Sequence, residues 1–270
     1  MSLPLLASPF GALSAVVRIG SVGVAISSLE SLYRRADLGP RGLLDGEVQV
    51  TRARWLLPLA FLAAPRVAVA LNGARLGAAC AVIAGGGSLA VARAGVIVIA
   101  LATLLLRIRT PLGIHTSGNM VMITFTAAAL GLGPGTPLSL GFALGFIAAQ
   151  ACLAYFVAGT AKLREPPWRS GRTITLLSST LMWGNGRQAV VLKAHPRLAF
   201  AVCWATMLGE STVPLALVVP LPAAIVLLAC AGVFHLLTAF EMGLNSFVWA
   251  FGSTYPAIIF CWYWLHGVRA

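Results

Sequence analysis

The chain has 270 residues, of which 59% are hydrophobic and 10% are charged, and its formal net charge is +12. A soluble domain cannot bury so large an apolar fraction, whereas a lipid bilayer accepts apolar side chains as a solvent does. This composition excludes an ordinary soluble protein. It predicts an all-α integral membrane protein with one transmembrane domain over residues 1–270.

Apolar stretches long enough to form helices follow one another along the chain. They cover residues 9–29, 66–86, 91–107, 117–132, 139–163, 195–211, 213–240 and 246–266. Because several lie near the ~20-residue spanning length and a few are shorter, we expect about eight spanning helices, within a range of roughly seven to nine. The first stretch lacks a basic lead-in and is long enough to span, so we expect a retained helix and no removable signal peptide.

The cations lie mainly in two polar connections, residues 33–55 and 164–194. Eight helices would place both connections on the same side, and the positive-inside rule makes that side cytoplasmic and the N-terminus external. A short amphipathic piece around residues 174–182 is expected to lie on the membrane surface. Cations between apolar segments suit anionic lipid headgroups, so we expect membrane lipids and no nucleic acid as partners.

Cysteine and histidine residues are scattered singly through the chain and form no ligand-type spacing. Metal sites need several such side chains at short, characteristic intervals. No metal is therefore expected, and the cysteines are most simply small buried apolar side chains.

The charged residues within or at the ends of apolar stretches include Arg18, Glu210 and Glu241. A charge in a spanning helix is costly unless it has a partner or a role. Arg18 paired with Glu210 or Glu241 would be the simplest arrangement, a structural ion pair that holds the bundle together.

A polar stripe on one helix suggests a lined cavity. His235, Thr238, Glu241 and Asn245 fall within about a third of the helix circumference at roughly 100° per residue. Tyr155 and Lys162, seven residues apart, share a face of another helix. Lys162 has two interpretations that the residues leave open. It is either a lysine that anchors a helix end at the interface, or a tuned base in a dry cavity.

Several segments resemble one family. Tyr155-Phe156-Val157-Ala158-Gly159-Thr160-Ala161-Lys162-Leu163, followed by Trp168 and Gly171, is similar to the Tyr-Phe-x-Ala-Gly-x-x-Lys-Leu…Trp…Gly stretch of vitamin K-dependent gamma-carboxylases. Val17-Arg18-Ile19-Gly20 with the loop up to Gly46, Glu210 at a late helix, and Phe234-His235-Leu236…Phe247 resemble further segments. The chain thus resembles the HTTM family, the membrane domain shared with these carboxylases, in the short bacterial form of the sporulation-delaying protein B group.

The resemblance implies a function and a set of site residues. Lys162 stands where the carboxylases have the base that deprotonates reduced vitamin K, so it implies a catalytic base and a reduced quinone of the vitamin K or menaquinol type as cofactor. Tyr155, Trp168, His235 and Asn119 would contact the cofactor, with Asn119 near the place of a functional histidine in the carboxylases. Withdrawal from water favours the neutral amine over the ammonium, and a neutral amine can accept a hydroquinone proton.

The resemblance also implies a secreted or membrane peptide as substrate, a partner protein, and a bacterial plasma membrane as the location. A non-catalytic alternative stays open: an accessory membrane protein that presents a peptide, lipid or quinone to a partner. That alternative expects Lys162→Arg to be tolerated, because an anchor needs charge but no titratable amine. A secondary transporter is disfavoured, since the chain has neither inverted repeats nor paired broken helices.

Overall fold

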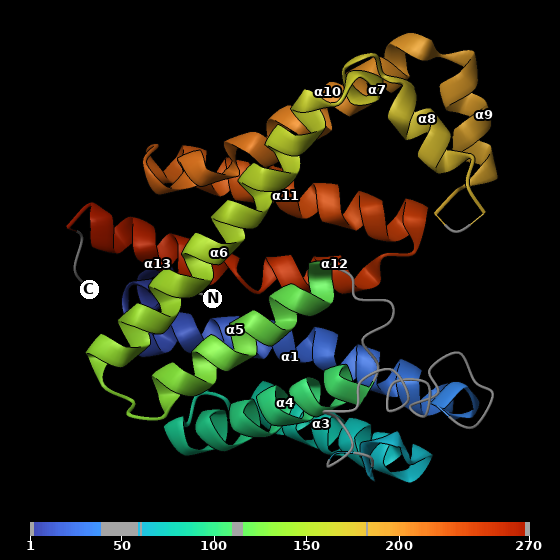
Figure 1. The fold of residues 1–270 in the computed structure, drawn as a ribbon. Helices are drawn as coiled ribbons and strands as arrows, with labels where there is room; N and C mark the ends of the chain where they lie inside the picture. Colours follow the sequence, from blue (N-terminus) through green and yellow to red (C-terminus); the bar gives the residue numbers. More distant parts are fainter. Residues whose placement is uncertain (1–2, 39–58, 60, 110–115, 182, 268–270) are drawn as a thin grey trace. The chain divides into compact units, whose positions relative to one another are not determined.

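The computed structural model describes residues 3–38, 59, 61–109, 116–181 and 183–267, and these are helical with no strand among them, which confirms the all-α prediction (Figure 1). The helices are α1 (Pro9–Tyr33), α3 (Pro65–Gly85), α4 (Leu89–Arg109), α5 (Thr116–Leu132), α6 (Pro137–Arg164), α7 (Pro166–Arg169), α8 (Arg172–Ser178), α9 (Gly186–Ala194), α10 (Pro196–Thr212), α11 (Leu221–Met242), α12 (Asn245–Gly252) and α13 (Tyr255–Leu265). Three 3-10 turns accompany them: η1 (Leu3–Ala7), η2 (Arg35–Leu38) and η4 (Val213–Leu217).

Proline marks the beginning of many helices. Pro9, Pro65, Pro137 and Pro196 are the first residues of α1, α3, α6 and α10. The first turn of a helix leaves its N–H groups without intrahelical partners, so a residue that lacks the N–H costs nothing there, and its fixed φ suits the helix. The local sequence thus places these boundaries before any tertiary contact forms.

Six helices of the described chain are long and apolar enough to cross a membrane: α1, α3, α4, α6, α10 with η4, and α11. Helix α5, with 17 residues, is apolar but shorter. Each predicted apolar stretch is helical over most of its length, as an integral membrane protein requires, since helices satisfy their own backbone hydrogen bonds in lipid.

The last two predicted stretches are each interrupted. The 213–240 stretch divides into η4 and α11 around Pro220, and the 246–266 stretch divides into α12 and α13 around Ser253 and Thr254. Pro256 stands at the second residue of α13. Its ring and missing N–H prevent an unbroken helix from running through this point, so two shorter helices form instead. The sequence interpretation overlooked these prolines.

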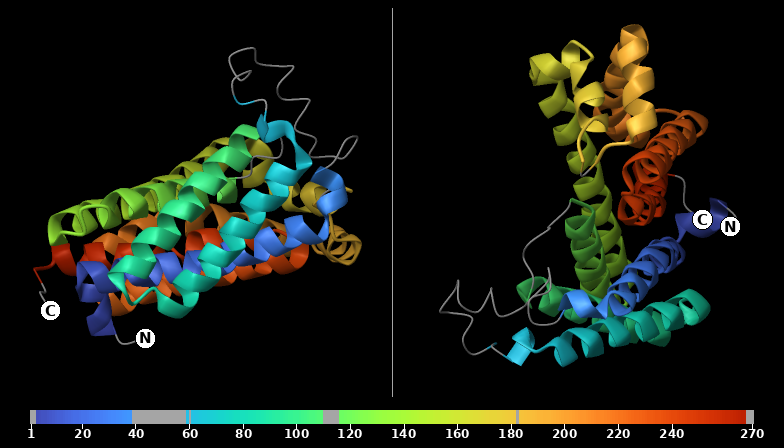
Figure 2. Two further views of the ribbon diagram at one scale, coloured as in Figure 1. Left: turned by 90° about the horizontal axis from the view of Figure 1, so that it is seen from below. Right: turned by 90° about the vertical axis from the view of Figure 1, so that its right-hand side faces the viewer.

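Two compact units make up the chain, Met1–Leu144 and Gly145–Ala270, and α6 runs from the first into the second. The prediction of one domain over residues 1–270 stays a prediction. In the first unit, α1 packs on α3, α3 on α4 and α4 on α5 (Figures 1 and 2). Ser14 of α1 donates to the carbonyl of Gly86 at 2.7 Å, which fixes the end of α3 against α1.

The second unit contains the C-terminal part of α6 and all later helices. Helices α7, α8 and α9 pack beside α10, and α12 packs on α11 (Figure 1). Helix α8 lies where the sequence predicted a short amphipathic piece, although it begins at Arg172 and ends at Ser178. Most of the first polar connection, including Gly46 of the family resemblance, lies outside the described residues.

Candidate functional site

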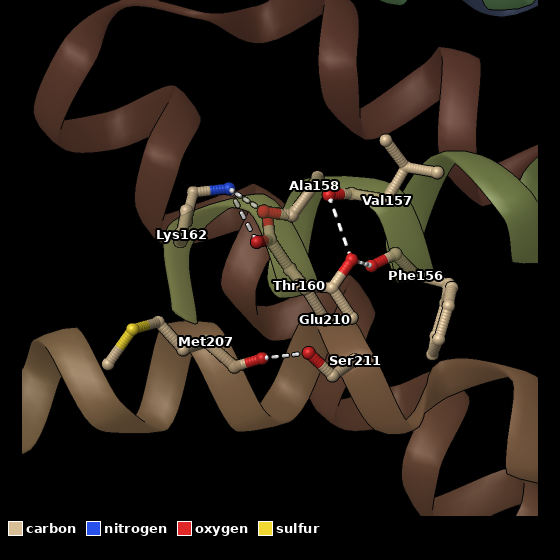
Figure 3. Close-up of polar contacts among 8 residues, drawn as sticks. All are labelled: Phe156, Val157, Ala158, Thr160, Lys162, Met207, Glu210 and Ser211. Carbon is tan, nitrogen blue, oxygen red and sulfur yellow. Dashed lines mark hydrogen bonds and ion pairs between the residues drawn. The ribbon is translucent and has the colours of Figure 1, made fainter. Parts of the chain in front are cut away.

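The central feature of the second unit is an ion pair between Lys162 of α6 and Glu210 of α10. Lys162 Nζ lies 2.5 Å from Glu210 Oε2 and 3.4 Å from the carbonyl oxygen of Ala158 (Figure 3). The Glu210 side chain is 10% exposed and that of Lys162 is 22% exposed. The Lys162 ammonium is therefore directed at a carboxylate within the helix pair.

Gly159 lets α6 and α10 come close enough for this pair to form. A Cβ atom at position 159 would lie 2.4 Å from Ser211 Oγ, 2.5 Å from Ser211 N and 2.9 Å from the carbonyl oxygen of Met207. Two of these three atoms belong to the backbone and cannot rotate away. Small residues allow this kind of close helix approach in membrane proteins. Ser211 Oγ itself donates to the Met207 carbonyl at 2.7 Å, so its hydroxyl is satisfied within α10 (Figure 3).

Trp168 covers the ion pair from α7. Its ring centroid lies 5.5 Å from Lys162 Nζ, within the range of a cation–π contact. The tight turn after α7 holds Trp168 here, because Gly171 adopts φ +78° and a Cβ there would lie 2.6 Å from Phe200 Cα. A side chain with a Cβ is strained at such a φ and would also meet the α10 backbone. The family-like segment therefore brings Lys162 and Trp168 together.

A second cluster joins α6, α11 and α13 through hydrogen bonds. Tyr155 Oη lies 2.7 Å from His235 Nε2 and 2.9 Å from Tyr255 Oη. Tyr155 and His235 are only 3% and 4% exposed. Because Tyr155 has one proton, the chain runs in one of two directions: Tyr255 to Tyr155 to His235, or the reverse.

Aromatic rings surround His235 on several sides. The Phe251 ring stacks on it with centroids 4.8 Å apart and an interplanar angle of 21°, and the Phe247 ring lies 6.0 Å away. His235 Nδ1 is buried and has no hydrogen-bond partner among the described residues. An unsatisfied buried nitrogen costs about 1–3 kcal/mol, so this atom is a candidate contact for a group that the polypeptide does not supply.

The two clusters lie on one face of α6. Tyr155 and Lys162 are seven residues apart, which is two helical turns or about 10 Å along the axis. The structure thus brings four of the sequence-predicted residues, Tyr155, Lys162, Glu210 and His235, to neighbouring positions in the second unit.

The other predicted residues have partners elsewhere. Asn119 belongs to the first unit, where its Oδ1 accepts a hydrogen bond from Arg107. Arg18, also in the first unit, donates through Nε and Nη2 to the carbonyl of Ile83 at 3.1 and 3.0 Å.

Glu241, at the C-terminal end of α11, accepts a 2.8 Å hydrogen bond from Asn185 Nδ2. Glu210, assigned to Arg18 from the sequence, has Lys162 as its partner. The predicted pairing of Arg18 with Glu210 or Glu241 would join the two units, and it stays a prediction.

Several residues of the site escaped the sequence interpretation. Tyr255 could have been found as a tyrosine next to a proline at a helix break, and Phe251 as one of two phenylalanines one turn apart in an apolar segment. No local signal pointed to Asn185 as the partner of Glu241, because 56 positions separate the two.

Metal ligands do not gather in the described ranges: no group of three or more His, Cys, Asp or Glu side chains could hold an ion there. The five cysteines are free thiols. No family model, curated protein or solved structure matches the chain.

Proposed function

We propose that the chain is an enzyme or enzyme subunit of a bacterial plasma membrane, similar to the vitamin K-dependent carboxylases of the HTTM family, with Lys162 as general base. Its substrate would be a secreted or membrane peptide that it modifies or matures with the help of a reduced quinone. The observation that carries this proposal is the close pairing of Lys162 with Glu210 between apolar helices.

The ion pair supports a role for Lys162 as a base, because one proton can lie either on the Lys162 amine or on the Glu210 carboxylate. Moving the ammonium proton of Lys162 onto Glu210 gives a neutral amine and a neutral acid. Burial favours two neutral groups over two charged ones, so low solvation assists this transfer. Lys162 would then be free to accept a proton from an acidic hydroxyl of a substrate or cofactor.

The second cluster carries groups that suit the polar end of a quinone. His235 Nδ1 is a buried nitrogen without a partner among the described residues, and it can bond an oxygen of a flat ring. Phe247 and Phe251 supply aromatic faces beside it. A reduced quinone, when bound, would supply an acidic hydroxyl and reducing equivalents that react with oxygen. Lys162 would take this proton and become an ammonium, Glu210 would keep the proton that it received from Lys162, and Trp168 would shield the amine from water.

One observation favours a non-catalytic alternative. Lys162 Nζ already has Glu210, the Ala158 carbonyl and the Trp168 ring around it, which is what a structural cation needs. In that case the pair braces α6 against α10. The protein would then be an accessory component that holds a peptide, lipid or quinone for a partner protein.

Four variants distinguish a general base at Lys162 from a structural ion pair between Lys162 and Glu210. Purified protein in nanodiscs would be given reduced menaquinone, and quinol-dependent oxygen uptake would be measured beside thermal unfolding. Lys162→Met alone leaves the Glu210 carboxylate buried without a partner, which costs about 3–5 kcal/mol of stability. The double variant Lys162→Met with Glu210→Leu removes both charges, and such replacements are often neutral for stability. Lys162→Arg keeps the charge but removes the titratable amine.

If Lys162 is a general base, the double variant should regain wild-type stability but show no oxygen uptake. Lys162→Arg should be stable and inactive. Glu210→Gln should keep measurable but slower uptake, because the amine remains. Full activity in Lys162→Arg or in the double variant would overturn the catalytic role and leave the brace. The presence of menaquinone in the purified wild-type protein, measured by mass spectrometry, tests the cofactor independently.

A further inference from the structure

The α8–α9 hairpin, described over residues 172–181 and 183–194, combines exposed aliphatic side chains with cations. Between Glu165 and Glu210 the sequence contains five cations and no Asp or Glu: Arg169, Arg172, Arg187, Lys193 and Arg197. A segment of this length without any negative side chain produces a positive electrostatic potential at its surface.

The outward face of α9 carries both apolar and basic side chains. Val190 and Val191 are 68% and 47% exposed, while Ala189 and Leu192 on the opposite face are buried. At about 100° per residue, Arg187 lies between the two exposed valines and one turn before them, and Lys193 lies about 60° from Val190. Neither cation has an ion-pair partner among the described residues, in which the two ion pairs are Arg34–Asp37 and Lys162–Glu210.

Helix α8 and the turn after it add further exposed aliphatic side chains and a cation. Leu176 is 58% exposed and Leu181 is fully exposed, and Arg172 lies on the outward side of α8 with Leu176. Water would penalise such a run of aliphatic side chains, whereas the boundary between headgroups and acyl chains accepts them.

The rest of the second unit holds the hairpin in place. Gly171 packs against the Phe200 backbone of α10, and Trp204 Nε1 donates to the Arg169 carbonyl at 3.2 Å. Within the hairpin, Ser178 Oγ lies 2.7 Å from Gln188 Oε1, and Asn185 Nδ2 donates to Glu241 of α11 at 2.8 Å. The outward face is thus presented by a fixed element that is attached to α10 and α11.

We propose that the α8–α9 hairpin is a docking surface for anionic phospholipid headgroups, which lies in the bilayer interface beside the spanning helices. Leu176, Leu181, Val190 and Val191 enter the boundary of the acyl chains, and Arg172, Arg187 and Lys193 bind headgroup phosphates. Charge complementarity selects the lipid: a zwitterionic surface would satisfy the aliphatic side chains but offers no net negative charge to three cations.

The test uses the full chain in nanodiscs of phosphatidylcholine with increasing phosphatidylglycerol. An environment-sensitive fluorescent amino acid replaces Leu181, and its emission and its quenching by lipids labelled near the headgroup are recorded. The matched control has the same amino acid at Val218, which is 67% exposed in a turn of the second unit whose sequence neighbours, residues 211–240, include no cation.

The reporter at position 181 should be quenched by the shallow label, and its emission should shift to the blue as phosphatidylglycerol is added. The reporter at position 218 should not respond to phosphatidylglycerol. The triple variant Arg172→Gln, Arg187→Gln and Lys193→Gln should weaken the response by about fivefold for each cation removed. Its circular dichroism and its chromatographic profile should match those of the parent protein, because all three side chains are exposed.

Three results would overturn the proposal. One is a reporter at position 181 that stays water-like in every bilayer. Another is an equal response to phosphatidylcholine and phosphatidylglycerol that the triple variant leaves unchanged. The third is a response to a soluble poly-glutamate peptide but not to phosphatidylglycerol, which would assign the hairpin to an acidic protein partner.

Discussion

Replacing Gly159 by alanine should separate the two helices that carry the ion pair. The new Cβ would lie 2.5 Å from the backbone nitrogen of Ser211, whereas non-bonded heavy atoms prefer about 3.5–4.0 Å. Backbone atoms cannot rotate aside, so α6 has to move from α10 by about 1 Å to restore contact distance. We expect the Lys162–Glu210 distance to increase with this displacement.

The loss of stability caused by the close contact at Gly159 can be separated from other effects with a control substitution on the same helix. Gly145 lies in α6, and a Cβ there would meet nothing within 4 Å. Both Gly→Ala changes gain about 1 kcal/mol of helix propensity. The difference between the two variants therefore reports the packing term alone, for which overpacking of a tight contact gives about 1–3 kcal/mol.

The measurement is thermal unfolding of the purified protein in detergent, followed by circular dichroism. Gly159→Ala should be less stable than Gly145→Ala by the packing term, and Gly145→Ala should be as stable as the wild type or more so. Adding Ser211→Gly should give little rescue, because Ser211 N and the Met207 carbonyl remain in place. Equal stability of the two alanine variants, or full rescue by Ser211→Gly, would refute the close-approach argument.

Two further predictions concern hydrogen bonds of the second unit. Tyr155→Phe removes the hydroxyl that bonds both His235 and Tyr255, so it should destabilise the protein more than Tyr255→Phe, which removes one of these bonds. Each buried polar group left unpaired should cost about 1–3 kcal/mol of the free energy of unfolding. Unfolding in denaturing detergent ranks the two variants, and the reverse order would contradict the hydrogen-bond chain. Asn185→Asp keeps an oxygen for the α9 N-cap but places a carboxylate against Glu241, so it should destabilise the protein. In a double-mutant cycle, Glu241→Gln should restore the lost stability, whereas additive effects of the two changes would contradict the contact.

Local chemistry in the sequence predicted the helices well. Apolar stretches of spanning length form helices, because in lipid the backbone has to satisfy its own hydrogen bonds and a helix does so within one segment. Helix starts were predicted to within two residues at Pro9, Pro137 and Pro196, where the predicted stretches began at residues 9, 139 and 195. They were missed where a proline interrupts an apolar stretch, since hydropathy does not register the absent N–H of Pro256.

The candidate site was predicted in part. Tyr155 and Lys162 share a face of α6 because the helical period places residues seven apart in line. The sequence could also indicate that buried charges such as Glu210 need partners. It could not name the partner, and the Arg18 assignment rested on the type of charge alone.

The sequence by itself determined the class of the protein, its helical segments and the types of polar side chain that those segments bring into the apolar interior. Only the tertiary structure decided that Glu210 meets Lys162, that His235 meets Tyr155, and that Asn185 meets Glu241. The physical reason is range. Helix formation depends on contacts three or four residues apart, whereas each of these pairs depends on which two helices approach and at what register. For the ion pair, that register is permitted by a missing side chain at Gly159, whose effect appears only when α10 lies against it.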